Sequence, residues 1–386
     1  MAYDKVVDSA SLDSKLTQVA DAIRTKGNTS ADLQFPSGFI SAIQAIQTGT
    51  ELQIIVTVTS GATVTATKGS LSVSGTSVNN SCTLTVPEEG EWTVSATLGG
   101  QTSISNIVNV ISSYDTTLAF VSAILNDNSW EKIREISDAG TGANYWSIGD
   151  CKAVTLNGTV GHLSLSNYTI YAFILGFNHN AELEGQNRIH FQLGKTALSG
   201  GTDVCFCDNQ YAPDSGWSNP GEGYFVINDG SINQGGWQSC YMRTKICGTS
   251  LSSYSGTIIA VIPEALRSVL KPVTKYTDNY ANNAGWMSSY ITATTDYFFL
   301  LSAFEVSGSF TYVNKYEANK QLQYAYYSSG NSKIKYKHNG TSTIAYIWLR
   351  SPYANNNTDF VYVNTKGEVD YAHTYYSFGF APGFCV

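Results

Sequence analysis

The chain has 386 residues, a formal net charge of −8 and only 13% charged residues. Its length exceeds one ordinary domain, so two or three domains are expected. The acidic balance argues against a protein that neutralises nucleic-acid phosphates with clustered Lys and Arg. Apolar residues make up 42% of the chain, enough for sizeable cores, which argues against global disorder.

Tyrosine, glycine and small polar residues take the place of the missing charges, with 25 Tyr and 34 Gly in the chain. We therefore expect a surface that is polar but largely uncharged, with tyrosine exposed. Such a composition resembles an antibody-combining surface, where Tyr supplies rigid amphipathic area and Ser, Asn and Gly supply adaptable hydrogen bonds. It favours a binding protein over a metabolic enzyme.

No targeting or membrane segment is evident. The start, MAYDKVVDSA, lacks a basic region followed by an apolar run, so no secretion signal is expected. No stretch reaches the roughly 18–20 apolar residues of a membrane span. The odd cysteine count predicts buried thiols of a protein made in a reducing cytosol. These cysteines are Cys82, Cys151, Cys205, Cys207, Cys240, Cys247 and Cys385.

Residues 1–49 predict two short helices. The first carries Leu12, Leu16, Val19 and Ile23 at i, i+4, i+7 and i+11, one stripe of a helix that ends near residues 26–28. After a turn at residues 35–38, a second apolar run predicts the second helix, with Phe39, Ile40, Ile43 and Ile46. Two such helices cannot bury their apolar faces alone. We expect them to pack on copies of themselves or on a larger assembly; a helical cap on the next domain is the alternative.

Residues 50–114 change to a period of two. Short Thr- and Val-rich runs separated by glycines predict a small antiparallel β-sandwich that serves as a spacer. The expected strands are Ile54–Thr59, Thr63–Thr67, Leu71–Ser74, Cys82–Val86, Trp92–Thr97 and Ile107–Val110. The segment Pro87–Val94 resembles the last hairpin of bacterial Ig-like or carboxypeptidase-regulatory-like spacer modules, which implies a spacer.

Residues 115–386 predict an α+β domain with long loops. We expect a helix around Thr117–Ile136, with a possible interruption at residues 126–128, and another at Pro263–Leu270. Aromatic-rich short strands and Gly/Asn/Ser loops fill the rest. A loop-rich domain of this length usually exists to present its loops.

The sequence contains no recognisable catalytic constellation. P-loop, dinucleotide-binding, zincin and nucleophile-elbow motifs are absent. His179 and His190 could lie near each other, as a metal pair, a general base or hydrogen-bonded structural histidines. Cys205 and Cys207 lack partners at zinc-finger spacing. Four acidic residues could in principle bind calcium but lack EF-hand spacing; they are Glu182, Glu184, Asp203 and Asp208.

The most informative stretch runs from Trp348-Leu349-Arg350-Ser351-Pro352 to Phe380–Val386. Between these anchors, alternating apolar residues from Phe360 predict a strand, residues 365–367 a turn and Val369 the start of a return strand. An apolar and glycine frame thus carries a row of polar and aromatic side chains. The row consists of Tyr353, Asn355, Asn356, Asn357, Asp359, Tyr362, Asn364, Glu368, Asp370, Tyr371, His373, Tyr375 and Tyr376.

These end motifs resemble those of the variable proteins of diversity-generating retroelements, which include the phage major tropism determinant. Upstream segments of similar type are Tyr145–Asp150, Leu156–Gly158, Ile174–Asn180 and Gly235–Trp237. The resemblance covers roughly residues 115–386. Residues 12–46 are similar to a short module at the start of Firmicutes phage tail proteins.

The resemblance implies a C-type lectin-like fold, related to the formylglycine-generating-enzyme type, with a ligand surface diversified at adenines. The polar row would be that ligand surface, and Arg350 would pair structurally beneath it. The implied scaffold is Trp348, Leu349, Phe360, Val363, Gly367, Gly379, Pro382 and Phe384.

The expected function is a phage or prophage tail-associated receptor-binding protein, without catalytic activity, cofactor or metal. Its expected partner is a bacterial surface protein or glycan, and its N-terminal segment would join other tail proteins or form a homotrimer. Nucleic-acid binding and membrane insertion are not expected. The protein would act in the virion tail after synthesis in the bacterial cytoplasm without a signal peptide. The alternatives are a structural virion or cell-surface protein and a copper-dependent oxidase of the same fold that uses paired cysteines, for which the candidates are Cys205, Cys207, Cys240 and Cys247.

Overall fold

The structure is a computed structural model that describes residues 9–27, 29–45, 51–208, 210–211, 225–281 and 285–386. The chain divides into two compact units, Met1–Phe120 and Val121–Val386. It is a mixed α+β protein with about 23% helix and 36% strand, and one of its sheets curls like half a barrel. None of the helices in the described ranges has both the length and the apolarity to cross a membrane.

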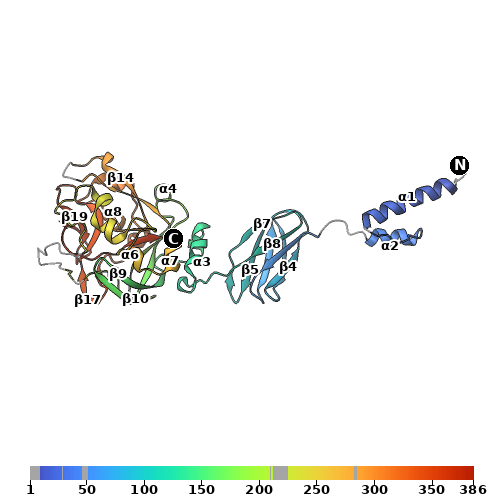
Figure 1. The fold of residues 1–386 in the computed structure, drawn as a ribbon, viewed down its shortest axis with the longest axis horizontal. Helices are drawn as coiled ribbons and strands as arrows, with labels where there is room; N and C mark the ends of the chain where they lie inside the picture. The colour runs from blue at the N-terminus through green and yellow to red at the C-terminus, as the bar shows by residue number, and fades with distance from the viewer. Residues whose placement is uncertain (1–8, 28, 46–50, 209, 212–224, 282–284) are drawn as a thin grey trace. The chain divides into compact units, whose positions relative to one another are not determined.

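Two helices, α1 (Ser9–Gly27) and α2 (Ser37–Ala45), open the first unit (Figure 1). They confirm the two predicted helices; Ile46, the expected end of the second, lies outside the described residues. Ile23 packs with Phe39 of α2 in a small core. Leu12 and Val19, from the same predicted stripe, stay 45% and 48% exposed. Only half of the stripe is therefore covered by α2.

Eight strands form the rest of the first unit and confirm the six that were predicted. They make two sheets, one in the order β4-β1-β8 and one in the order β3-β2-β5-β6, with β7 paired to β5. Alternate side chains of both sheets, among them Val64 and Trp92, form one core. The strands are β1 (Gln53–Thr57), β2 (Thr63–Lys68), β3 (Leu71–Thr76), β4 (Ser81–Thr85), β5 (Gly90–Leu98), β6 (Gln101–Thr102), β7 (Asn106–Val110) and β8 (Ser113–Thr117).

The sandwich extends further along the chain than predicted. Strand β8 pairs in parallel with β1, so the sandwich is not wholly antiparallel. The expected boundary after residue 114 falls inside β8, and the division after Phe120 replaces it. Residues 113–117 form a strand because their backbone pairs with β1, from Ser113 opposite Gln53 to Thr117 opposite Thr57, and their side chains show no alternating burial that the sequence could have revealed.

The expected helix around Thr117–Ile136 is wrong in its first half. A short turn, η1 (Leu125–Asp127), precedes a helix that starts only at α3 (Trp130–Asp138). The side chain of Asn128 donates to the carbonyls of Ser122 (2.9 Å) and Ile124 (3.0 Å) and so fixes a non-helical loop.

The second unit contains a five-stranded sheet in the order β15-β21-β11-β10-β9, of which Figure 1 labels β9 and β10. The last strand of the chain lies between β11 and β15, and the side chain of Val386 is fully buried. The strands are β9 (Cys151–Val160), β10 (Leu163–Phe177), β11 (Ile189–Lys195), β15 (Phe298–Phe299) and β21 (Gly383–Cys385).

Three smaller sheets have the strand orders β12-β16-β17, β13-β14 and β18-β19-β20. Their strands are β12 (Val204–Cys205), β13 (Val273–Asp278), β14 (Ile291–Asp296), β16 (Lys335–Lys337), β17 (Gly340–Ala345), β18 (Ile347–Pro352), β19 (Asp359–Val363) and β20 (Val369–His373).

Short helices connect these sheets. The helix expected at Pro263–Leu270 is present as a single turn, α7. The helices are η2 (Gly142–Asn144), α4 (Ala181–Glu184), α5 (Gly236–Ser239), η3 (Met242–Cys247), α6 (Ile258–Val261), α7 (Glu264–Arg267), η4 (Ser288–Tyr290), α8 (Ala303–Ser307), η5 (Lys315–Asn319) and α9 (Ala325–Ser328). All seven cysteines are free and buried, which confirms their predicted burial.

Candidate functional site

The candidate site lies on the three-stranded sheet near the carboxyl end. Strand β19 pairs with both neighbours, and in its pairing with β20 Asp359 lies opposite His373 and Val363 opposite Val369. The turn between them contains Gly367 at φ +79°, a conformation that favours glycine. The predicted strand, turn and return strand are therefore confirmed.

The residues expected to form the scaffold do lie inside the unit. Trp348 donates its indole N–H to the carbonyls of Phe225 (3.1 Å) and Tyr376 (3.2 Å), so its orientation is fixed. Except for Gly367 in the turn, all of the expected scaffold is buried: Trp348, Leu349, Phe360, Val363, Gly379, Pro382 and Phe384. Gly379 has a packing reason to be glycine, since a Cβ there would lie 2.4 Å from the Cys205 sulfur.

Three tyrosine rings from two separate segments meet at the surface of the second unit. Tyr353 and Tyr371 stack with ring centroids 4.2 Å apart and planes 11° apart. Tyr312 meets both edge-on, at 5.9 Å and 5.0 Å. Tyr371 is 40% and Tyr312 is 37% exposed, and Tyr353 is half-buried. Aromatic pairs of this geometry add about 0.5–1.5 kcal/mol each beyond area burial, so this tyrosine trio is a pre-ordered surface feature.

The thirteen residues of the predicted ligand surface differ in exposure. Four of them are exposed: Asn355, Asn357, Glu368 and Tyr371. Six are half-buried: Tyr353, Asn356, Asn364, Asp370, His373 and Tyr376. Three are buried: Asp359, Tyr362 and Tyr375. The expectation that these last three side chains point outward is therefore wrong.

Tyr362 is buried because it belongs to an aromatic cluster on the inner side of the sheet. Its ring lies 4.9 Å from that of Phe378, 5.1 Å from that of Tyr346 and 6.2 Å from that of Trp348. A tyrosine is amphipathic, so its residue type alone did not distinguish a core position from a surface position.

Tyr375 and Asp359 are held by His373. The His373 ring stacks on Tyr375 with planes 11° apart. Its Nδ1 lies 2.7 Å from a carboxylate oxygen of Asp359, which gives an ion pair when the ring is protonated. The other Asp359 oxygen accepts from the Asn356 amide at 2.7 Å. These contacts connect the strand ends to the loop between β18 and β19.

Two asparagines of the predicted surface shape the backbone. The side-chain oxygen of Asn356 accepts from the backbone N–H of Thr358 and Asp359, both at 3.0 Å. The side-chain oxygen of Asn364 accepts from the N–H of Lys366 (2.9 Å) and of the residue two further on (3.0 Å). Both act as turn-forming side chains, which leaves Asn355 and Asn357 as the freely presented amides of this row.

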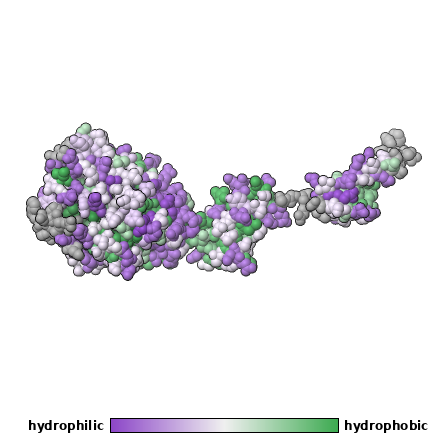
Figure 2. All heavy atoms as spheres, viewed as in Figure 1, coloured by the Kyte–Doolittle hydropathy of each residue, from purple (hydrophilic) through white to green (hydrophobic). Residues whose placement is uncertain are grey.

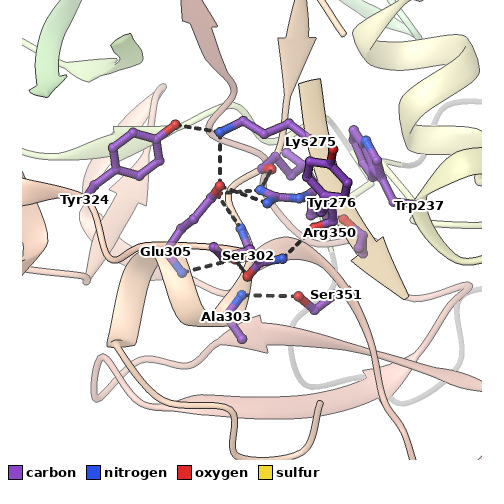
Figure 3. A network of polar contacts seen from close by, with 12 residues as sticks. Trp237, Lys275, Tyr276, Ser302, Ala303, Glu305, Tyr324, Arg350 and Ser351 are labelled. Atoms are coloured by element: carbon purple, nitrogen blue, oxygen red, sulfur yellow. Dashed lines mark hydrogen bonds and ion pairs between the residues drawn. The ribbon is translucent and has the colours of Figure 1, made fainter. Parts of the chain in front are cut away.

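Arg350 of strand β18 belongs to a buried ion network with Glu184, Lys275, Glu305 and Tyr324. Figure 3 shows Lys275, Glu305, Tyr324 and Arg350 directed toward one another. The two guanidinium nitrogens of Arg350 both bond to the Glu305 carboxylate, one of them at 2.8 Å. The ammonium of Lys275 lies 3.0 Å from Glu305, 2.6 Å from Glu184 and 2.8 Å from the Tyr324 hydroxyl. The expectation that Arg350 pairs structurally beneath the surface is confirmed.

The local sequence explains how Glu305 reaches this position. Ser302 begins helix α8 by accepting from the Glu305 N–H at 3.0 Å, and the Glu305 carboxylate accepts from the Ser302 N–H at 3.0 Å. This capping box fixes the first turn of the helix. Arg350 also donates to Thr277 (3.0 Å) and to the Leu300 carbonyl (2.9 Å), so three segments meet at one guanidinium.

The network also determines what the nearby histidines can do. The rings of His179 and His190 lie 5.5 Å apart, which confirms that the two imidazoles come together. Ligand atoms of His179, Glu184 and Glu305 lie within 4.8 Å of one another, a spacing that could suit a metal ion. However, the Lys275 ammonium already lies between the two carboxylates, and a divalent ion would meet that charge at short range. The geometry fits an internal ion network better than a metal centre.

The charge states agree with this assignment. Burial raises the pKa of Glu184 to about 7 and lowers that of His179 to about 3. Burial would also raise the pKa of Glu305, but Arg350 and Lys275 together hold it well below its usual range. At neutral pH, Glu305 is therefore the fixed anion of the network and His179 is neutral.

The four cysteines considered for oxidase chemistry, Cys205, Cys207, Cys240 and Cys247, are all buried. The Cys205 and Cys207 sulfurs lie 3.7 Å apart, and both side chains are fully buried. Burial raises the pKa of Cys240 to about 12 and that of Cys247 well above its usual value. Buried thiols with raised pKa values are poor nucleophiles and poor metal ligands.

Some residues of the site were not predicted from the sequence. Glu305 had a local signal, since Ser302 and Glu305 follow the capping-box spacing. Lys275 and Tyr312 had none, because their partners lie far away in the chain. The acidic residues considered for calcium do not share one site, since Glu184 binds Lys275 and Asp203 binds Lys195 at 2.8 Å.

Fold and site together define an α+β protein with a pre-ordered aromatic surface above a buried ion network. The family described as Domain of unknown function (DUF6273) matches residues 225–386. That range contains the tyrosine trio and every member of the ion network except Glu184. No curated protein and no solved structure matches the chain.

Proposed function

We propose that this protein is a non-enzymatic binding protein, a phage or prophage tail-associated receptor-binding protein that recognises a bacterial surface molecule. In this proposal the second unit is C-type lectin-like, and the surface around the trio of Tyr312, Tyr353 and Tyr371 contacts the receptor. One observation carries the proposal: these partly exposed rings are ordered by one another on a sheet whose opposite side is fixed by buried contacts.

The physical argument is one of pre-organisation. A side chain that is already ordered loses little entropy when a partner covers it, so more of the contact energy appears as affinity. Tyrosine also combines apolar area with a hydroxyl, which suits recognition surfaces. The exposed amides of Asn355 and Asn357 supply hydrogen-bonding groups on the loop that follows Tyr353. The resemblance of the end motifs to variable proteins of diversity-generating retroelements supports the same role.

For the N-terminal helices we propose attachment to other tail proteins or self-association as a trimer. Their own core contains three buried side chains, Ala20, Ile23 and Phe39. On α2, Ile40 and Ile43 remain 55% and 54% exposed. Helices this short gain most of their stability from packing against a neighbour, so a partner that covers these residues would stabilise them.

The test is binding of the labelled full chain to a panel of bacterial strains, measured by flow cytometry. Replacing both Tyr353 and Tyr371 with Ala should reduce labelling at least tenfold, since a central anchor contributes about 2 kcal/mol or more. The melting temperature should fall by only a few degrees, because both rings are partly exposed. Tyr114→Ala is the matched control: this tyrosine of the first unit is 42% exposed. Equal labelling by the double variant and the control would instead favour a purely structural protein.

A further inference from the structure

The tyrosine trio is only part of a larger uncharged surface built from three segments. Residues 285–290, 308–312 and 353–358 contain no Asp, Glu, Lys, Arg or His. Their exposed side chains include Trp286 (45%), Met287 (49%) and Phe310 (48%) beside Tyr312. Figure 2 shows apolar residues reaching the surface among polar ones on the visible face of the second unit.

Hydrogen bonds connect the three segments. The Tyr312 carbonyl accepts from the N–H of Ala354 at 2.9 Å, which joins residues 308–312 to the loop after β18. The fully buried Asn314 donates its amide to the Met287 carbonyl at 3.1 Å and to Asp278 at 2.8 Å. These bonds connect the three segments to one another, although they are distant in the sequence, and the ring contacts of Tyr312 extend the group to Tyr371.

Tyr312 occupies its position at a conformational cost. Its φ is +72°, a left-handed conformation that bulky residues rarely adopt. Such residues cost on the order of 1–3 kcal/mol and persist where the surroundings or the function require them. Here the strained backbone directs the ring of Tyr312 onto Tyr353 and Tyr371 at the surface. Because the ring is partly exposed, its burial offsets little of the conformational cost.

We infer that the recognition surface is composite, with Tyr312 as its fixed anchor, and that it fits an uncharged, apolar face of a protein. This inference rests on the proposed function and specifies its partner. Interface cores are depleted of charged residues and enriched in Tyr, Trp, Phe and Met, as these three segments are. A polyanionic cell-wall polymer requires clustered Lys or Arg, and the three segments contain none. Lys315, whose ammonium lies 5.6 Å from the centroid of the Trp286 ring, is a single cation at their edge. A saccharide would set hydroxyls against Phe310 and Met287, which offer no hydrogen bonds in exchange for the lost water, and the amides of Asn355 and Asn357 lie at one end of the surface only.

The test uses intact cells of a strain that the wild-type chain labels. Tyr312→Gly removes the ring and relaxes the backbone, so its melting temperature should not fall. Labelling by this variant should drop about tenfold or more, and Phe310→Ala should also weaken it. Leu198→Ala should label like wild type; Leu198 is 44% exposed and lines a separate hollow together with Asp150, Lys195 and Tyr326.

Treatment of the cells identifies the chemistry of the partner. Protease treatment of the cell surface should abolish wild-type labelling, and periodate oxidation of its sugars should leave it intact. The opposite pattern would assign a glycan and overturn the inferred partner. If Tyr312→Gly and Phe310→Ala label like wild type while Tyr371→Ala does not, the composite surface is overturned but the proposed function stands. If the wild-type chain labels none of the panel strains, the proposed function fails and this inference fails with it.

Discussion

Replacing Glu305 with glutamine tests the buried ion network most directly. Glutamine has nearly the same shape and can still complete the capping box with Ser302. The substitution removes the one fixed negative charge that Arg350 and Lys275 share. The acidic groups that remain near the two buried cations are Glu184 and, beside Arg350, Glu317, and burial raises the pKa of each to about 7.

The expected cost follows from the geometry. Removing one partner of a buried ion pair costs about 3–5 kcal/mol, because the remaining charge stays uncompensated. For a unit the size of residues 121–386, 1 kcal/mol corresponds to roughly 2 °C in melting temperature. The Glu305→Gln variant should therefore melt ~6–10 °C below wild type, and its urea midpoint should fall with an unchanged slope.

Glu317→Gln is the matched control. Glu317 is also fully buried, but it accepts from the Asp278 N–H (2.9 Å) and the Ser351 hydroxyl (2.6 Å) and has no ion pair of its own. Burial raises its pKa to about 7, so a neutral amide replaces a group that is already half neutral. Calorimetry and urea titration at pH 7 should show a cost below about 1.5 kcal/mol. An equal cost for both variants would refute the account of Glu305 as the shared anion.

Two further predictions concern pH and packing. Because burial raises the pKa of Glu317, its contribution to folding stability is complete below pH 4.5 and is lost as the pH rises through 7. Between pH 4.5 and pH 8, the free energy of unfolding of Glu317→Gln should therefore increase by up to about 3 kcal/mol relative to that of wild type, as measured by urea titration. His179 has the opposite pH dependence, because burial lowers its pKa. Its neutral ring contributes fully to folding stability above pH 6.5, and this contribution is lost as the pH falls toward 3. Gly379→Ala should cost at least 1–3 kcal/mol in thermal unfolding, because its Cβ would overlap the Cys205 sulfur; a cost under about 0.5 kcal/mol would contradict the packing described here.

The periodicity of apolar residues and the positions of glycines predicted the strands and turns that form between residues close in the sequence. The sandwich strands followed from period-two runs punctuated by glycine, and the hairpin of β19 and β20 followed from alternation around Gly367. Where a nearby side chain competed for the backbone, the pattern misled: the apolar spacing after Thr117 is helical, but Asn128 fixes part of it as a loop.

The candidate site divides in the same way. Tyr371 was predicted because it lies in an alternating row, whereas Tyr312 joins it only through folding. Tyr362 and Tyr375 lie in the same row but face other aromatic rings. A single sequence gives the residue type and the strand period but not which side of a twisted three-stranded sheet is covered.

The positions of the turn-forming asparagines have a consequence for protein engineering. A library that randomises every polar residue of the carboxyl-terminal hairpin would also replace Asn356 and Asn364, whose side chains fix the loops on which the other residues stand. Most members of such a library would be lost to poor folding rather than to poor binding. A library limited to Tyr353, Asn355, Asn357 and Tyr371, with both loop-fixing asparagines retained, would explore new specificities on an intact support.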